Sequence, residues 1–262
     1  MIFKTVRRKI STIPSYIKGN RLGYGLRLYL RKSLKVPVII KTIRGANIYL
    51  GFDLIDDIIL KDLNVGLANV YFPPGLDLIE GDIVWDVGGH HGIFAMELAA
   101  NYPGIRIFSF EPDINSSRYF KFNRFLNRNT KTQLVDAALD VSTNTAYIVK
   151  SIDGSWGNFV QKESIEGSRK IKTRSISDVL DFYDIKVIKY AKFNAEGAEF
   201  VVLPELFRLN VFPNLILLFV HPEKGDVDNL IHIICSNSYK LERCHTDKNR
   251  PWYLFRFVKY FA

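Results

Sequence analysis

Short apolar runs alternate with longer stretches of helical periodicity from about residue 70 to the end of the chain. Seven runs have the length and composition of buried strands, namely DIVWDV (82–87), RIFSFE (106–111), QLVDAA (133–138), YAKFNA (190–195), NLILLFV (214–220), YKLERCH (239–245) and WYLFRFVK (252–259). Between them, helical periodicity covers 92–102, 114–127, 176–183, 198–210 and 226–237. This alternation predicts an open α/β sheet of seven strands.

The connections refine this architecture. Only TDKNRP separates the last two strands, which is too short for a parallel crossover and predicts a terminal antiparallel hairpin. Residues 46–80 mix apolar runs with breakers, which indicates a small cap. We therefore divide the chain into a basic N-terminal segment and cap (1–69) and a main domain (70–262). Residues 144–173 are less regular, and SIDGSWGNF is expected to be a loop that brings Trp156 over a site or forms an ordinary surface excursion.

Positive charge is concentrated at the N-terminus. The formal net charge is +9, yet residues 1–52 hold twelve Lys and Arg and no Asp or Glu, so the remainder is slightly acidic. This pattern is typical either of peripheral contact with an anionic membrane through residues 1–45 or of a basic helix pair docked on the core. No uninterrupted apolar stretch follows these charges, so a secretory signal is not expected. With only Cys235 and Cys244, we expect a cytoplasmic protein, peripheral at the inner membrane face if the segment binds lipid.

The stretch DVGGHHG (86–92) between the first strand and the first helix predicts a ligand site. Its three glycines, Gly88, Gly89 and Gly92, allow the backbone to approach a ligand closely. Their spacing differs from the first, third and sixth positions of a dinucleotide fingerprint, which disfavours a nicotinamide enzyme. Asp86 would repel a pyrophosphate but suits a cationic ligand such as S-adenosyl-L-methionine, with its ammonium and sulfonium groups.

Further polar residues follow the ends of other predicted strands. Glu111 closes the second strand, where a carboxylate can accept both ribose hydroxyls. Asp136 ends the third strand and either accepts from an adenine amino group, with Ala137 and Ala138 leaving room for the ring, or serves as a cap or turn residue. Asn194 and Glu196 lie at the end of the fourth strand, the edge at which open α/β sheets bind ligands.

These motifs together resemble the FkbM-type methyltransferases. The resemblance runs from about residue 65 to 245 and includes GDIVWDVGGHHGIFAMELA, IRIFSFEPD, TRSISDVL, YAKFNAEGAEFVVL and LILLFVHPE. It implies a class I methyltransferase (Rossmann-like) sheet of seven strands and O-methylation with S-adenosyl-L-methionine, in that family often of sugar hydroxyls on glycans, glycolipids or natural products. By position, Asp86, Gly88 and Gly92 would surround the methionine moiety and Glu111 would hold the ribose.

The chain departs from the family pattern at three places. It has His90 where the family usually has the Asn of G-A-N, Asn194 where D-V-E-G-A-E begins with Asp, and Phe219 and Val220 where an acid commonly precedes His221. The change at 194 removes a potential base or metal ligand, although Asn194 can still orient a hydroxyl. These departures favour an alternative, a module that binds the cofactor without turnover.

Methyl transfer to a hydroxyl requires a base, and the candidates are Glu196, His91 and His221, in that order. Each also has a structural explanation, since an acid in a first helical turn stabilises the helix dipole and histidines are often simply packed. We expect no metal site, because His90 and His91 are neighbours on a tight turn whose side chains should point apart. A nucleic-acid methyltransferase that uses the basic segment is a further alternative, against which stands the lack of an N-P-P-Y or D-P-P-Y tetrad at the fourth strand.

Overall fold

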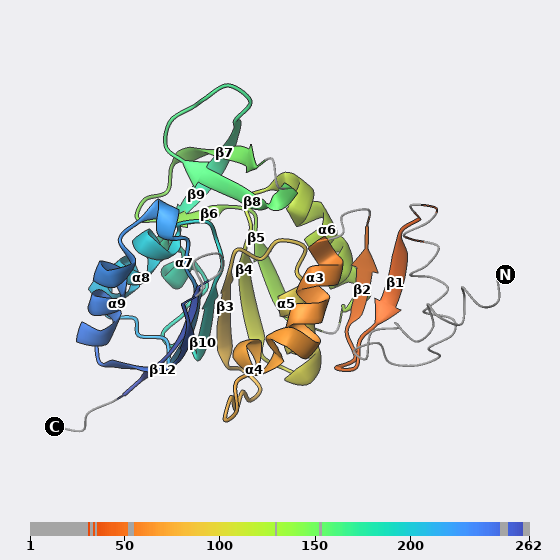
Figure 1. Ribbon diagram of the computed structural model, residues 1–262, viewed down its shortest axis with the longest axis horizontal. Helices are drawn as coiled ribbons and strands as arrows, with labels where there is room; N and C mark the ends of the chain where they lie inside the picture. The colour runs from red at the N-terminus through yellow and green to blue at the C-terminus, as the bar shows by residue number, and fades with distance from the viewer. Residues whose placement is uncertain are drawn as a thin grey trace.

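The computed structural model describes residues 31, 34, 36–51, 55–128, 130–151, 154–246 and 251–258. Its main sheet has the strand order β12-β13-β11-β10-β3-β4-β5. The bounds are β3 (Ile83–Val87), β4 (Arg106–Phe110), β5 (Lys131–Val135), β10 (Tyr190–Phe193), β11 (Leu215–Phe219), β12 (Tyr239–His245) and β13 (Trp252–Phe257). The strands β5, β4, β3, β10 and β11 are parallel neighbours, and β13 is antiparallel to both β11 and β12. The predicted seven-stranded α/β sheet with its terminal hairpin is confirmed (Figure 1).

Successive strand residues point to opposite faces of this sheet. Because apolar residues lie on both faces, helices cover both of them. The five predicted helices are present within two residues of the expected ends, namely α5 (Ile93–Asn101), α6 (Ile114–Leu126), α7 (Ile176–Phe182), α8 (Glu199–Arg208) and α9 (Val227–Ser236). Val84 belongs to an apolar cluster with α5, whereas its neighbour Trp85 belongs to a second cluster with α7, α8 and α9. Two buried layers therefore hold the sheet rigidly, with the ends of its strands as the platform for a site.

A second sheet corrects the prediction for residues 133–173. The strand β5 ends at Val135, and the chain then enters β6 (Ala138–Asp140), which belongs to a sheet of order β6-β9-β7-β8. The other members are β7 (Thr145–Ser151), β8 (Gly154–Gln161) and β9 (Arg169–Ser175). The stretch expected to be a Gly and Ser loop is largely β8, because pairing with β7 overrides its weak local strand preference. The side chain of Trp156 lies outside what the structure describes, so its covering role stays a prediction.

The N-terminal elements pack on the same core as the main sheet. They are the hairpin of β1 (Val38–Lys41) and β2 (Asn47–Leu50), followed by α3 (Ile55–Lys61), the π-helix η1 (Asp62–Gly66) and α4 (Ala68–Tyr71). Ile48, Leu60 and Leu63 are fully buried in the cluster that contains α5. This cap therefore lies beside the glycine turn, which opens α5. The division at residues 69 and 70 stays a prediction.

Most of the basic segment falls outside the described residues, which begin with Arg31. The predicted membrane contact of residues 1–45, and the docked helix pair that competes with it, therefore stay predictions. In the described part of the chain, no helix has both the length and the apolar character needed to cross a membrane.

Candidate active site

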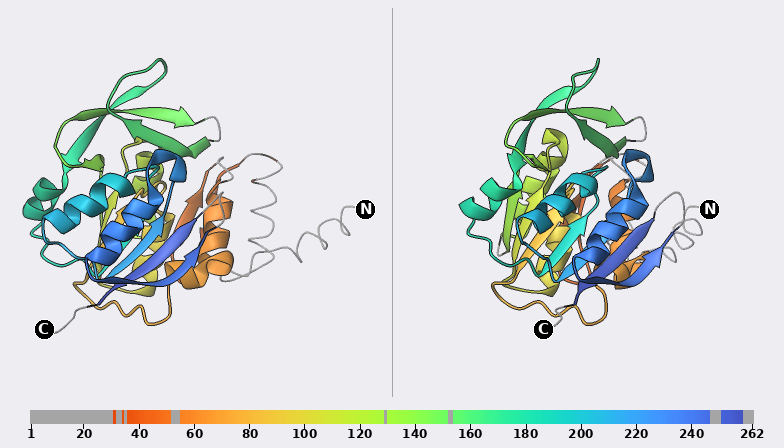
Figure 2. Two further views of the ribbon diagram at one scale, coloured as in Figure 1. Left: turned by 60° about the vertical axis from the view of Figure 1, so that its left-hand side comes forward. Right: turned by 90° about the vertical axis from the view of Figure 1, so that its left-hand side faces the viewer.

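A cavity of about 760 Å³ opens between the two sheets. Its floor is made by the carboxyl ends of β3, β4, β10 and β11, and its opposite wall by residues 157–162 of β8 and the turn after it. The green strands of the second sheet lie over that edge of the main sheet (Figure 2). The volume lies in the range typical of small-molecule sites, and the position is the one at which open α/β sheets bind ligands.

The glycine turn places the backbone of β3 against that of β10. Gly88 lines the cavity with a φ of +83°, and a Cβ there would lie 1.9 Å from the carbonyl oxygen of Asn194. Gly92, with a φ of +78°, lies against the ring of Phe120, which a Cβ would approach to 2.6 Å. A Cβ added to Gly89 would likewise lie close to the side chains of Ser109 and Phe120. Of the three glycines, Gly88 faces the cavity, whereas Gly89 and Gly92 allow close packing of α6.

Asp86 is fully buried beneath this turn and is paired within the protein. Its carboxylate accepts hydrogen bonds from Nζ of Lys192 at 2.8 Å and from the hydroxyl of Ser109 at 3.1 Å. The same ammonium group donates to the carbonyl oxygen of Gly88 at 2.8 Å. Asp86 thus shapes the turn from below and does not line the cavity, so its direct contact with the methionine moiety stays a prediction. Lys192 was not expected at the site, although a lysine inside an apolar strand is a signal that the sequence carries.

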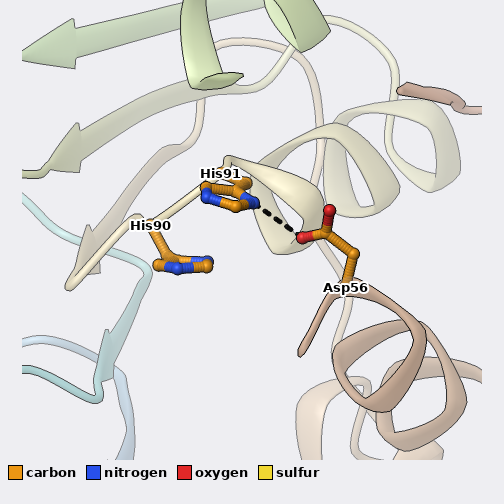
Figure 3. A group of neighbouring side chains, drawn as sticks. All are labelled: Asp56, His90 and His91. Carbon is orange, nitrogen blue, oxygen red and sulfur yellow. Dashed lines mark hydrogen bonds and ion pairs between the residues drawn. The ribbon is translucent and has the colours of Figure 1, made fainter. Parts of the chain in front are cut away.

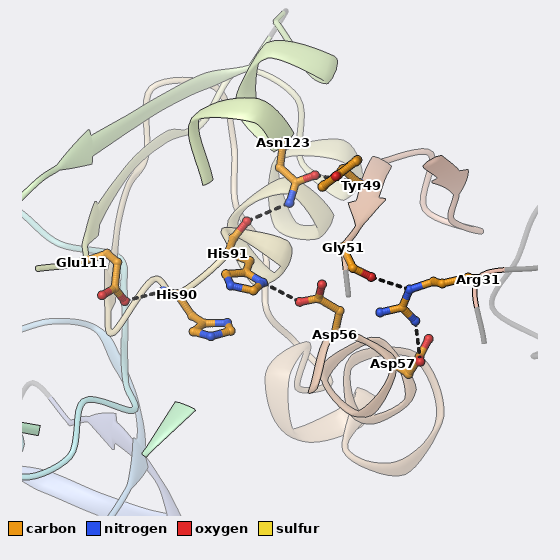
Figure 4. A network of polar contacts seen from close by, with 9 residues as sticks. All are labelled: Arg31, Tyr49, Gly51, Asp56, Asp57, His90, His91, Glu111 and Asn123. Carbon is orange, nitrogen blue, oxygen red and sulfur yellow. Dashed lines mark hydrogen bonds and ion pairs between the residues drawn. The ribbon is translucent and has the colours of Figure 1, made fainter. Parts of the chain in front are cut away.

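Glu111 lies at the cavity wall, as expected for the residue that holds the ribose. One carboxylate oxygen accepts from the backbone N–H of His90 at 2.7 Å (Figure 4), and the other from that of Asp113 at 2.8 Å. Burial raises the pKa of Glu111 to about 7, against the effect of these two hydrogen bonds. Each oxygen keeps acceptor capacity for one hydroxyl.

This pKa leads to a prediction on cofactor binding. Ionised Glu111 can accept from both ribose hydroxyls, so the affinity for S-adenosyl-L-methionine should rise as the pH passes about 7. With a pKa of about 7, the ionised fraction of Glu111 is about tenfold larger near pH 8 than near pH 6. We therefore expect S-adenosyl-L-methionine to bind about tenfold more tightly near pH 8 than near pH 6. Calorimetric titration of wild type and Glu111→Gln at both pH values measures this. An equal pH dependence in the two proteins would contradict the assignment.

The structure places Asp136 and Ala137 away from the cavity. The third strand ends before them, and the carboxylate of Asp136 pairs with Lys121 at 2.6 Å on the surface, with both side chains 51% exposed. Neither Asp136 nor Ala137 is among the residues that line the cavity. The chain turns into β6 there, so Asp136 and Ala137 do not border the cavity. Ala138, the other residue expected beside the adenine, does line it together with Leu139.

A histidine between two glutamates closes the other end of the cavity. The buried carboxylate of Glu199 accepts from the backbone N–H and from Nδ1 of His221, both at 2.9 Å. On the opposite side of the ring, Nε2 of His221 lies 3.1 Å from the carboxylate of Glu196. Burial disfavours a charged ring, but hydrogen bonds to Glu196 and Glu199 and their negative charges outweigh it and raise the pKa of His221 to about 10. A cationic His221 has no free lone pair, so this pKa disfavours it as the base at neutral pH, and its selection as a candidate base stays a prediction.

Glu196 remains as the base candidate that faces the cavity. Its φ of +50° is unusual for a residue with a side chain, and such strain persists where the surrounding structure enforces it, commonly at functional sites. Asn194, which ends β10, lines the cavity beside it. The structure thus brings together Glu196, Asn194 and His221, three of the four residues proposed for catalysis.

The fourth, His91, lies behind the turn. It is buried, is not among the cavity-lining residues, and its Nδ1 lies 2.7 Å from the carboxylate of Asp56 in α3. Its proposed role as a base is corrected, because a proton on a ligand in the cavity is out of its reach. The expectation that His90 and His91 point apart is also wrong, since their rings stack with centroids 3.8 Å apart.

The family model for the methyltransferase FkbM domain matches residues 86–241, more than half of the chain. This protein belongs to the FkbM methyltransferase family. It is accordingly an S-adenosyl-L-methionine-dependent methyltransferase with the class I, Rossmann-like fold that its strand order displays. Comparison with curated proteins finds no match.

Solved structures of several methyltransferases are similar to this chain at low identity. Precorrin-6y C5,15-methyltransferase from Geobacter metallireducens GS-15 is 13% identical, with 73% of this chain and 87% of that chain covered and a TM-score of 0.44. A putative rRNA-methylase from Clostridium thermocellum is 10% identical, covering 74% and 96%, with a TM-score of 0.46. A putative methyltransferase from Streptococcus mutans in complex with SAH is 8% identical, covering 74% and 97%, with a TM-score of 0.44. Likenesses this distant carry no information on the acceptor.

Proposed function

We propose that this methyltransferase transfers its methyl group to a hydroxyl oxygen of a sugar carried on a glycan, a glycolipid or a natural product. The observation that carries the proposal is the arrangement of Glu196, His221 and Glu199 at the cavity. A hydroxyl is a poor nucleophile at neutral pH and needs a positioned proton acceptor. An amine or thiolate acceptor would depend less on such a group.

The residues would divide the chemistry as follows. S-adenosyl-L-methionine, when bound, would supply an electrophilic methyl group on a sulfonium and would leave as the neutral thioether. Asn194 would orient the acceptor hydroxyl, and Glu196 would take its proton. His221 and Glu199 hold the carboxylate of Glu196 in place. Alignment of the two reactants inside the cavity would supply much of the acceleration.

The far wall of the cavity supports a polyhydroxylated acceptor. It presents side chains that can donate or accept hydrogen bonds, among them Gln161 and Lys162. The ring of Phe159 lies beside them, with Nζ of Lys224 3.6 Å from its centroid. An apolar ring face next to polar side chains suits a sugar, which has both apolar C–H and polar hydroxyl surfaces.

The proposal is tested by incubating the purified chain with the cofactor carrying a labelled methyl group and a panel of acceptors. The panel contains soluble glycans, nucleotide sugars and lipid-linked sugars, with RNA in parallel for the nucleic-acid alternative. We expect a sugar product heavier by one CH₂ that fragments as a methyl ether, formed together with the demethylated cofactor. Label found on RNA or on an amine would contradict the proposal.

A further inference from the structure

Three potential metal ligands gather at the glycine turn. Asp56 comes from α3, and His90 and His91 come from the turn itself (Figure 3). One ligand atom of each residue lies within 4.8 Å of the others. The carboxylate and the imidazoles are separated by more than thirty residues in the chain, and only the packing of the cap on the main domain brings them together.

The carboxylate of Asp56 is the second observation that indicates a cation. The residue is fully buried, and Oδ1 lies 2.7 Å from Nδ1 of His91. Its other oxygen, Oδ2, has no hydrogen-bond partner in the described part of the chain. Leaving a buried carboxylate oxygen without a partner is unfavourable, and buried charges are ordinarily paired or coordinate a metal.

We propose that Asp56, His90 and His91 bind one divalent transition-metal ion, zinc in particular. Two imidazole nitrogens and one carboxylate oxygen form a ligand set that suits Zn²⁺ and leaves a fourth position for water or a ligand. Ligand atoms around tetrahedral zinc lie roughly 3.4 Å apart, so the group has to close by at most roughly 1.4 Å. Rotation of the two stacked histidine rings about their side-chain bonds would turn one nitrogen of each ring toward the ion.

The ion would connect the cap to the cofactor site. The backbone N–H of His90 donates to Glu111, and the carbonyl oxygen of His91 accepts from Asn123 at 2.8 Å (Figure 4). Coordination of both histidines and Asp56 would therefore fix α3 relative to the turn and to Glu111. Methyl transfer as proposed above does not require this ion, so the two proposals can fail separately.

Calorimetric titration of the chelator-treated full chain with zinc chloride tests the site. We expect one zinc ion per chain with micromolar or tighter affinity, weakened at least tenfold by Asp56→Asn and by His90→Asn. Both variants retain polar side chains of similar size, and circular dichroism checks that they remain folded. The matched control is His245→Ala, which removes an exposed histidine next to Cys244 and should leave the zinc affinity unchanged.

The absence of stoichiometric zinc binding by the wild type would overturn the proposal. Loss of binding in His245→Ala, or wild-type affinity in both Asp56→Asn and His90→Asn, would also overturn it, since the ion would then bind elsewhere. Should a variant fail to fold, cobalt substitution of the wild type decides. Visible d–d absorption of bound cobalt without a near-ultraviolet thiolate charge-transfer band supports the site, and a strong band of that kind assigns the ion to a cysteine and overturns the proposal.

Discussion

Asp86→Ala lowers the free energy of unfolding by about 3–5 kcal/mol, the effect expected for removing one partner of a buried ion pair. Its carboxylate is fully buried and lies 2.8 Å from Nζ of Lys192, whose side chain is 6% exposed. The variant would leave this ammonium group desolvated without its counter-charge. Urea unfolding followed by circular dichroism measures the loss, and calorimetry with S-adenosyl-L-methionine on the folded fraction measures any separate effect on binding.

The matched control removes both charges. Asp86→Asn combined with Lys192→Met leaves no buried ion, so the double variant should be more stable than Asp86→Ala, because paired removal is often neutral. Lys192→Met alone should be destabilised, since Asp86 then keeps only Ser109 as a partner. If Asp86→Ala unfolds like the wild type and loses only cofactor binding, Asp86 serves the cofactor and not the fold.

Glu196→Gln lowers kcat by about 10²–10⁴-fold, the contribution typical of a positioned general base. The amide keeps the shape of the side chain but cannot take a proton from the acceptor hydroxyl. The affinity for S-adenosyl-L-methionine should stay within about twofold of wild type, because the cavity residues expected to contact the cofactor are Glu111 and Gly88. Steady-state rates with the acceptor found in the screen, together with calorimetry, separate the two quantities.

Glu223→Gln is the control for this variant, since Glu223 is an exposed acid that also lines the cavity. Its kcat should remain close to that of wild type. His221→Gln should lower kcat less than Glu196→Gln, because it removes a positioning residue and not the base. If the Glu196→Gln variant had the kcat of wild type, another group or water would be the base.

Much of the fold could be predicted because its signals are local. The buried parallel strand β11 is a continuous apolar run, and six residues between β12 and β13 allow only a hairpin. The turn DVGGHHG predicted a ligand-binding edge, and Gly88 and Gly92 in it have positive φ and close contacts. Glu111 was expected at the same edge and lines the cavity there, because the ends of adjacent parallel strands lie side by side.

The partners of the charged residues were decided by tertiary structure. Asp86 and Lys192 are far apart in the chain, and only the pairing of β3 with β10 brings them face to face. The approach of Asp56 to His91 depends in the same way on the packing of α3 against the main domain.

Tertiary pairing also overruled local sequence preference around the cavity. The glycine-rich stretch after β7 became the strand β8 and a cavity wall, although its composition is typical of a loop. The strand β5 ends at Val135, earlier than predicted, so Asp136 lies on the surface. Hydrophobic periodicity therefore determined which elements form and in what order, because the apolar face that an element buries depends on residues close together in the sequence. The partner of each buried polar group is set by contacts between distant segments, which no local pattern encodes.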